Sequence, residues 1–181
     1  VDSSAASDVY KRQELALPIG YQQTISQPYI VARMTESLIE GDKMNEVPIN
    51  HCLEIGTGCG YQTYILSLFS KKVTSVERIE PLQDKAKETL KNLGVRNVTF
   101  KIDDGNNLGR LKYDAILSAA APLSVPSSLK ERLAVGGRLI LPVGDSQRQV
   151  LTLIHRIDND SYEEKRLEDV LFVPLLKGIV S

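Results

Sequence analysis

The feature that most constrains this sequence is a run of alternating glycines, Gly56, Gly58 and Gly60, in the stretch LEIGTGCGYQTYILSLF at residues 53–69. The apolar, partly β-branched residues before the glycines predict a strand, and the apolar residues after them recur at helical spacing. Glycines let the chain turn through backbone angles that a Cβ forbids, and they let a ligand approach the main chain. A strand, a glycine turn and a helix therefore predict a nucleotide-like ligand.

The spacing of the glycines narrows the choice of ligand. The dinucleotide fingerprint G-x-G-x-x-G has its third glycine at the position of Tyr61, and no Walker-type Gly-Lys-Ser/Thr follows. The chain instead has E-x-G-x-G-x-G from Glu54, with Glu77 at the end of the next predicted strand, where a carboxylate can accept both ribose hydroxyls. This pattern resembles the first motif of class I S-adenosylmethionine methyltransferases. Taken alone, such a turn also fits a dinucleotide site or no site at all.

Length, charge and cysteine content limit the remaining classes. The 181 residues fit one domain, and the net charge of −1 argues against nucleic acid or a membrane surface as the main partner. No apolar run approaches the roughly 18 residues of a spanning helix. Cys52 and Cys59, with two histidines, support neither a disulfide framework nor a metal site, so no metal is expected. We expect a cytoplasmic monomer in which an exposed Cys59 would be sensitive to alkylation.

Residues 1–13, VDSSAASDVYKRQ, differ from the rest of the chain in composition. They are small and polar, then charged, without an apolar period, which predicts a disordered terminus. The hexapeptide DVYKRQ also matches the translation of a transposon end. The second interpretation of residues 1–13 is therefore that they are not native to the protein. We therefore expect a single domain over residues 14–181.

The rest of the chain alternates predicted strands and helices. Besides the helix after the glycines, helices are expected at residues 28–39, 80–94 and 126–133. Strands are expected at residues 48–55, 71–77, 97–102, 113–122, 138–143, 149–158 and 168–176. Gly136 and Gly137 are expected to turn the chain, and residues 158–166 to form a polar turn between the last two strands. The order predicts an α/β fold: a doubly wound, mostly parallel seven-stranded Rossmann-like sheet with an antiparallel C-terminal strand pair.

Three further places could contact a ligand. Ser26 precedes a helical stripe, so it is either a helix cap worth about 1 kcal/mol or a donor to an anion at the helix start. Asp104, before a glycine, forms an ordinary turn or binds an adenine amino group. The small residues at 119–121 leave room for a substrate or pack under a helix. Since ligands bind at the carboxyl ends of the strands in such sheets, we expect these places to converge with the glycines and Glu77.

The block LPIGYQQTISQPYIVARMTE at residues 17–36 makes the resemblance specific. It is similar to the signature of protein-L-isoaspartate O-methyltransferases, which reads approximately LPIGxGQTISQPYxVAxMTE. The similarity continues through LEIGTGCGYQT, VERIEPL, the Asp-Gly pair, YDAIL, AAAP, VGGRLILPVG and FVPLLKG. Gln22 and Asp103 depart from the family, which usually has glycine at both positions. The family also carries a further helical segment before LPIG, so an N-terminally truncated domain is expected.

The resemblance implies a protein repair enzyme. It would transfer a methyl group from S-adenosyl-L-methionine to the α-carboxylate of L-isoaspartyl residues, leaving S-adenosyl-L-homocysteine, and its partners would be isoaspartyl-containing peptides and proteins. The implied catalytic residue is Ser26, which would orient the carboxylate. The implied cofactor-binding residues are Glu54 near the cationic end, Glu77 on the ribose, Gly56, Gly58, Gly60, Arg78, Asp104 and Gly105. The implied substrate-binding residues are Thr24, Ile25, Gln27, Ala120, Ala121 and Pro122.

Other functions stay open on the residues alone. A class I methyltransferase acting on another carboxylate or a small molecule would keep the glycine motif and Glu77 without needing the TISQP block. A truncated chain that binds the cofactor without turnover is a further alternative. An NAD enzyme is disfavoured by Tyr61 at the third-glycine position.

Overall fold

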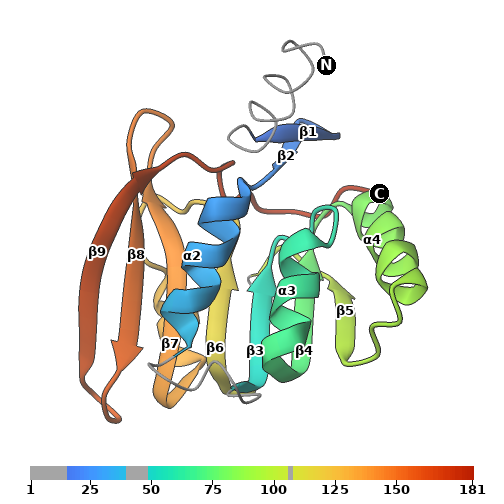
Figure 1. Ribbon diagram of the computed structural model, residues 1–181. Helices are drawn as coiled ribbons and strands as arrows, with labels where there is room; N and C mark the ends of the chain where they lie inside the picture. Colours follow the sequence, from blue (N-terminus) through green and yellow to red (C-terminus); the bar gives the residue numbers. More distant parts are fainter. Residues whose placement is uncertain (1–15, 40–48, 106–107) are drawn as a thin grey trace, which may run out of the picture.

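Within residues 16–39, 49–105 and 108–181, which the computed structural model describes, a seven-stranded sheet has the order β5-β4-β3-β6-β7-β8-β9 (Figure 1). Its strands are β3 (Ile49–Ile55), β4 (Ser70–Glu77), β5 (Val98–Ile102), β6 (Tyr113–Ser118), β7 (Leu133–Gly144), β8 (Gln149–Arg156) and β9 (Tyr162–Val170). The strands from β5 to β7 pair in parallel, and β8 and β9 add antiparallel pairs at one edge. The predicted fold class, including the antiparallel pair, is confirmed.

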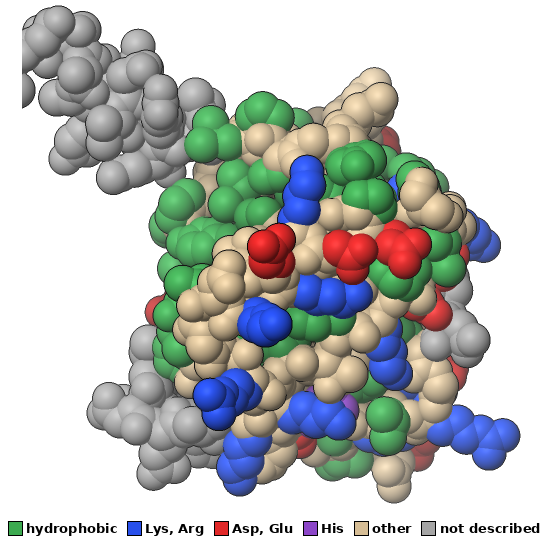
Figure 2. All heavy atoms as spheres, turned by 90° about the vertical axis from the view of Figure 1, so that its right-hand side faces the viewer, with side chains coloured by type: hydrophobic (Ala, Val, Ile, Leu, Met, Phe, Trp, Pro, Cys, Tyr) green, Lys and Arg blue, Asp and Glu red, His purple; other side chains and the backbone are tan. Residues whose placement is uncertain are grey.

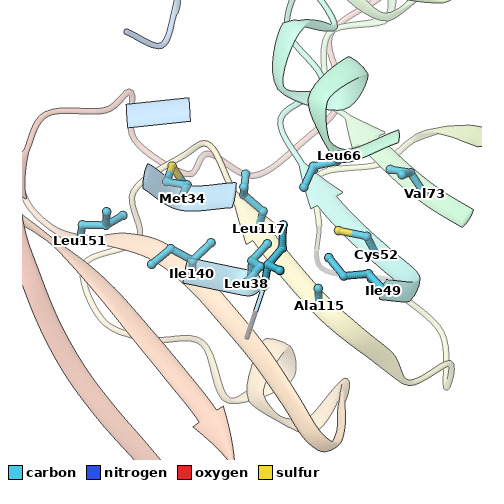
Figure 3. Close-up of a cluster of buried hydrophobic side chains, with 11 residues drawn as sticks. Met34, Leu38, Ile49, Cys52, Leu66, Val73, Ala115, Leu117, Ile140 and Leu151 are labelled. Carbon is cyan, nitrogen blue, oxygen red and sulfur yellow. The ribbon is translucent and has the colours of Figure 1, made fainter. Parts of the chain in front are cut away.

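Helices cover both faces of the sheet. The helices are α2 (Pro28–Leu38), α3 (Tyr61–Phe69), α4 (Glu80–Asn92) and α5 (Ser127–Glu131) among the described residues. Met34 of α2 and Leu66 of α3 pack with Cys52 in a buried cluster on one face (Figure 3), whereas Leu129 of α5 packs with Leu53 in a second cluster. Successive strand residues point to opposite faces, so the neighbours Cys52 and Leu53 belong to different clusters. The sheet is therefore buried on both sides, as a parallel sheet requires.

The exposed face of α4 is charged, as its sequence predicts. Figure 2 looks onto the side of the molecule that carries α4 and shows acidic and basic side chains interspersed there. One such pair joins Lys87 Nζ to Asp84 Oδ1 at 3.0 Å. An exposed pair of this kind contributes little to stability, so this face is best described as solvated.

A short hairpin leads into α2. Its strands are β1 (Leu17–Gly20) and β2 (Gln23–Ile25), which pair antiparallel. The two joining residues, Tyr21 and Gln22, have positive φ angles of 53° and 59°. Such a turn favours glycine or asparagine, because left-handed backbone costs other residues roughly 1–2 kcal/mol. The departure from the family signature at Gln22 therefore falls on a position where the backbone favours glycine.

The last strand differs from its predicted position. Residues 162–170, expected mainly as a polar turn, form β9, and residues 171–176 leave the sheet. Charged side chains are tolerated in β9 because it is an edge strand whose residues are mostly exposed, and charges also oppose pairing with another sheet. Residues 171–176, which contain Pro174, instead cross the carboxyl end of the sheet (Figure 1). This crossing segment becomes part of the site.

Two smaller predictions are also corrected. Gly136 and Gly137 lie inside β7 and do not end it, and the pairing of β6 with β7 shifts register there. A Cβ on Gly137 would come within 3.0 Å of the Tyr113 carbonyl oxygen, so the glycine permits close approach of the two strands. The helix α5 is shorter than the predicted residues 126–133.

Some predictions are outside the reach of the structure. The prediction for residues 1–13 concerns a part of the chain outside the described residues. A single domain over residues 14–181 stays a prediction. In the described ranges, no helix is both long enough and apolar enough to cross a membrane.

Candidate active site

A cavity of about 460 Å³ lies at the carboxyl ends of the central strands. The glycine loop after β3, the turn after β4 and the residues after β5 and β6 line it. The hairpin, the start of α2 and residues 169–176 complete the lining. Ligands of open α/β sheets bind at this end, and the volume falls within the usual range for small-molecule sites.

Most of the predicted site residues meet at this cavity. Those that line it are Thr24, Ile25, Ser26, Gln27, Gly56, Gly58, Glu77, Arg78, Asp104 and Ala120. The structure does not place the others in its lining: Glu54, Gly60, Gly105, Ala121 and Pro122. The predicted convergence at the strand ends therefore holds for the first group, whose individual roles stay predictions.

Glu77 holds the glycine loop and the turn that follows its own strand. Its Oε2 accepts a hydrogen bond from the Gly58 N–H at 3.0 Å. Its Oε1 accepts hydrogen bonds from the N–H groups of Arg78 and Ile79, at 2.9 and 3.0 Å. A carboxylate with this many backbone donors is fixed in orientation, so it presents a rigid negative group to the cavity.

The loop glycines keep the cavity open. Gly56 and Gly58 have positive φ angles of 93° and 54°. A Cβ on Gly56 would lie 3.3 Å from Ala119 Cβ, and one on Gly58 would lie 3.3 Å from Ile19 Cδ1. Side chains at these positions would fill the space between the loop and the neighbouring residues. The loop therefore leaves room for a ligand because these two positions have no side chain.

Glu54 lies behind the glycine loop and is not among the residues that line the cavity, and its contact with the ligand stays a prediction. It is fully buried, and its side chain shares the face of β3 that α3 covers. Its Oε2 accepts hydrogen bonds from Thr63 Oγ1 at 2.6 Å and from Ser75 Oγ at 2.5 Å. Ser75 Oγ is in turn 2.6 Å from Thr57 Oγ1 in the loop. Glu54 of β3 is therefore linked directly to α3 through Thr63 and to β4 through Ser75. Ser75 extends this network to Thr57 of the glycine loop.

Burial gives Glu54 an unusual pKa. Desolvation raises the pKa of this carboxyl to about 8, the hydroxyl donors of Ser75 and Thr63 oppose the rise, and the charge of Glu77 adds to it. The folded chain therefore keeps a proton on Glu54 at pH values where the unfolded chain has lost it. The resulting stabilisation is fully present below the unfolded pKa of 4.5 and is lost as the pH rises through about 8.

We expect the free energy of unfolding to fall between pH 5 and pH 8.5 more steeply in the unaltered chain than in a Glu54→Gln variant. One titrating group contributes a slope of at most about 1.4 kcal/mol per pH unit. Urea unfolding at several pH values measures both slopes. Parallel curves for the two chains would show that Glu54 is ionised in the fold at neutral pH.

Ser26 lies between β2 and α2 and lines the cavity. The residue at the cap position of α2 is Gln27, and no side chain caps this end of the helix. The Ser26 hydroxyl makes no hydrogen bond to any of the described residues. The structure therefore does not use Ser26 as a helix cap, and its hydroxyl is available to a ligand.

The remaining predicted residues support the cavity wall. Gly60, at φ 87°, is the N-cap residue of α3, and a Cβ there would meet Leu90 and Ala86 of α4 within 3.3 Å. Gly105 packs against Ile55 in the same way. Ala121 exchanges backbone hydrogen bonds of 2.8 Å with Val173 and Leu175 of the crossing segment, and the Pro122 carbonyl accepts one from Gly144. These residues shape the site without lining it.

The lining also includes residues that the sequence did not predict, among them residues 169–176 and Gln62. Residues 169–176 were expected in a strand, although the FVPLLKG block, with its proline and without strict alternation, could have signalled a crossing segment. Gln62 of α3 also lines the cavity, and its Nε2 donates to Thr35 Oγ1 at 3.0 Å, which ties α3 to α2. In the part of the chain that the structure describes, no group of three or more acidic, histidine or cysteine side chains is placed to hold a metal ion.

The fold, with its cavity at the carboxyl ends of the strands, is that of class I methyltransferases. An N-methyltransferase from Bradyrhizobium japonicum shares the fold at a TM-score of 0.52, with 16% identity over 66% of this chain and 68% of that one. The particular family follows from sequence. A family model described as protein-L-isoaspartate(D-aspartate) O-methyltransferase matches residues 2–179, and the chain belongs to this family.

Curated relatives named protein-L-isoaspartate O-methyltransferase support the membership. One from Saccharophagus degradans is 52% identical over 92% of this chain and 74% of its own length. One from Alcanivorax borkumensis is 46% identical over 99% of this chain and 79% of its own length. The chain spans only 57% of a relative from Burkholderia vietnamiensis, at 47% identity.

Solved structures agree with the sequence relatives. A protein-L-isoaspartate O-methyltransferase from Plasmodium falciparum, in complex with S-adenosyl-L-homocysteine, has a TM-score of 0.74 and 25% identity over 90% of this chain and 80% of that one. A second structure with that enzyme name has a TM-score of 0.72 and 27% identity over 88% of this chain and 51% of that one. The predicted family, enzyme class and cofactor are confirmed.

Proposed function

We propose that this chain transfers a methyl group from S-adenosyl-L-methionine to the α-carboxylate of L-isoaspartyl residues in damaged proteins. The family membership supports this activity, and the related Plasmodium falciparum structure contains S-adenosyl-L-homocysteine. The observation that carries the proposal is that Ser26 shares one cavity with Glu77 and Asp104. The segment proposed to orient the acceptor therefore lines the same cavity as the residues proposed to hold the nucleoside.

The cavity fits an adenosine-bearing cofactor on its own features. The glycine cradle leaves space that a Cβ would fill, and the Glu77 carboxylate beside it can accept hydrogen bonds from two ribose hydroxyls. Asp104, at the end of the next strand, would accept a hydrogen bond from the adenine amino group. Gly56 and Gly58 would let the ligand approach the main chain.

The chemistry needs positioning more than acid or base catalysis. When bound, S-adenosylmethionine supplies a methyl group on a sulfonium sulfur, which the acceptor oxygen takes while the carbon–sulfur bond breaks. The acceptor carboxylate, with an ordinary pKa near 4, is already ionised at pH 7, so no protein group has to remove a proton. Ser26 Oγ–H would donate to the carboxylate and orient it, and orientation of reacting groups can supply roughly 7–11 kcal/mol. Residues 171–176 line the cavity, and in the proposal they would help to exclude water from the reacting groups once the ligands are bound.

The direct test is methyl transfer to a peptide that contains one isoaspartyl residue. The control is the same peptide with a normal aspartyl residue, and the label is a radioactive methyl group. Methylation of the isoaspartyl peptide alone is expected. Equal methylation of both peptides would favour a methyltransferase for other carboxylates, and binding of S-adenosylhomocysteine without any methyl ester would favour a chain that binds cofactor without turnover.

Cys59 provides a chemical test of where the cofactor sits. It lines the cavity and is partly exposed, whereas Cys52 is fully buried. Saturating S-adenosylhomocysteine is expected to slow alkylation of Cys59 by iodoacetamide about tenfold or more, because thiol reactivity requires access. Mass spectrometry follows both cysteines, and Cys52 should stay unmodified throughout. Alkylation of Cys59 at one rate with and without the ligand would place the cofactor elsewhere.

Isoaspartyl peptides and proteins are thus the proposed partners. The expectations of a monomer, of no nucleic-acid or membrane partner and of a cytoplasmic location stay predictions from the sequence. The family match leaves no specific observation in favour of a small-molecule acceptor.

A further inference from the structure

The last residues of the chain run over the carboxyl end of the sheet toward α4 (Figure 1). After β9, residues 169–176 line the cavity, and residues 177–181, here called the strap, reach the turn between β4 and α4. The strap does not line the cavity itself. It nevertheless contacts three residues that do: Arg78, Ile79 and Asp104.

Backbone hydrogen bonds anchor the strap to residues 78–80. The Val180 N–H donates to the Arg78 carbonyl at 2.7 Å, and the Glu80 N–H donates to the Val180 carbonyl at 2.9 Å. Arg78 Nε donates to the Gly178 carbonyl at 2.9 Å. Residues 78–80 also contain the Arg78 and Ile79 N–H groups that donate to Glu77. Because these bonds fix the turn, the strap is attached to a rigid part of the fold.

So anchored, the strap presents one donor to the site. The Gly178 N–H donates to Asp104 Oδ2 at 2.8 Å, although 74 positions separate the two residues in the sequence. Asp104 lines the cavity at the end of β5. A hydrogen bond to one carboxylate oxygen restricts rotation of the carboxylate and so determines where its other acceptor directions point.

The backbone of Gly178 makes this contact sensitive to substitution. Its φ angle is +85°, a conformation that costs a residue with a Cβ roughly 1–2 kcal/mol. A Cβ at Gly178 would meet nothing within 4 Å. Alanine at this position would therefore disturb the strap through the backbone alone, without a steric clash.

We propose that Gly178 is a positioning residue whose N–H orients the Asp104 carboxylate toward the adenine amino group of the cofactor. The inference rests on the proposed function. It assigns to the strap the part of cofactor affinity that depends on recognising adenine, and it leaves the methyl transfer step to other residues.

The test compares calorimetric binding of S-adenosylhomocysteine with that of S-inosylhomocysteine, in which an oxygen replaces the adenine amino group. Gly178→Ala is expected to weaken binding of the adenosyl ligand about tenfold, the effect of one hydrogen bond to a charged group, and that of the inosyl ligand less than threefold. Turnover at saturating cofactor should stay within about twofold. Gly178→Asn should restore most of the affinity, because asparagine tolerates positive φ.

Gly136→Ala is the matched control. Gly136 has a φ angle of +80°, a Cβ there also meets nothing within 4 Å, and the residue does not line the cavity. Thermal unfolding of both alanine variants separates a general loss of stability from a local effect. Equal affinities of the two variants, or an equal loss for both ligands, would overturn the proposal. If the unaltered chain binds neither ligand, the proposed function fails together with it.

Discussion

Replacement of Glu77 by glutamine is expected to weaken binding of S-adenosylhomocysteine about a hundredfold, since hydrogen bonds to a charged group each contribute about 1.5–3 kcal/mol. The ribose hydroxyls would lose a charged acceptor. The carboxylate oxygens now accept hydrogen bonds from the N–H groups of Gly58, Arg78 and Ile79. In the glutamine variant an NH₂ group would replace one of these oxygens, and an NH₂ group cannot accept such a bond. The glycine loop would loosen as a result. Isothermal titration calorimetry measures the dissociation constant directly.

Glu80→Gln is the matched control for this variant. It removes the same charge three residues later, from an exposed position that does not line the cavity. Its dissociation constant should stay within about twofold of the unaltered chain, as expected for a surface substitution. If both variants bind the ligand equally well, Glu77 serves only to hold the loop, and the ribose is bound by other groups.

Local conformation explains why much of this site could be predicted from sequence. Gly56 and Gly58 stand where the backbone needs positive φ, and few other residues tolerate that conformation, so the loop was visible in the sequence. Glu77 follows from the same logic, because a polar residue at the end of a buried strand reaches the edge of the sheet where the loop lies. Ser26 was placed by its block of sequence, since its helix-start position alone suited a cap equally well.

The features that could not be predicted depend on tertiary packing. The acidic residue Glu54 begins the motif, but whether its side chain faces the ligand or the layer beneath α3 depends on how α3 packs. Residues 162–170 carry little hydrophobic pattern, because an edge strand does not need it, and the sequence therefore favours the apolar run after them as the strand. The contact between Gly178 and Asp104 joins parts of the chain that only the folded sheet brings together.

Ser26 is the residue on which the acceptor side of the proposal depends. Its hydroxyl has no role as a helix cap, and the residue lines the same cavity as the glycine loop. Loss of a hydroxyl that only supports the fold would lower stability and both binding steps together. Loss of one that orients the acceptor would act on turnover and leave the cofactor site intact.

Ser26→Ala is therefore expected to lower kcat on an isoaspartyl peptide about a hundredfold, the usual effect of removing one donor that orients reacting oxygens. The dissociation constant of S-adenosylhomocysteine should change less than twofold, because the proposed nucleoside-binding residues Glu77 and Asp104 belong to other elements, at the ends of β4 and β5. Ser26→Thr keeps the hydroxyl and should recover part of the rate. Ser127→Ala, at the exposed start of α5, removes a comparable hydroxyl away from the cavity and should change neither quantity. Equal losses of turnover and cofactor affinity in Ser26→Ala would mean that Ser26 supports the structure of the site and does not orient the acceptor.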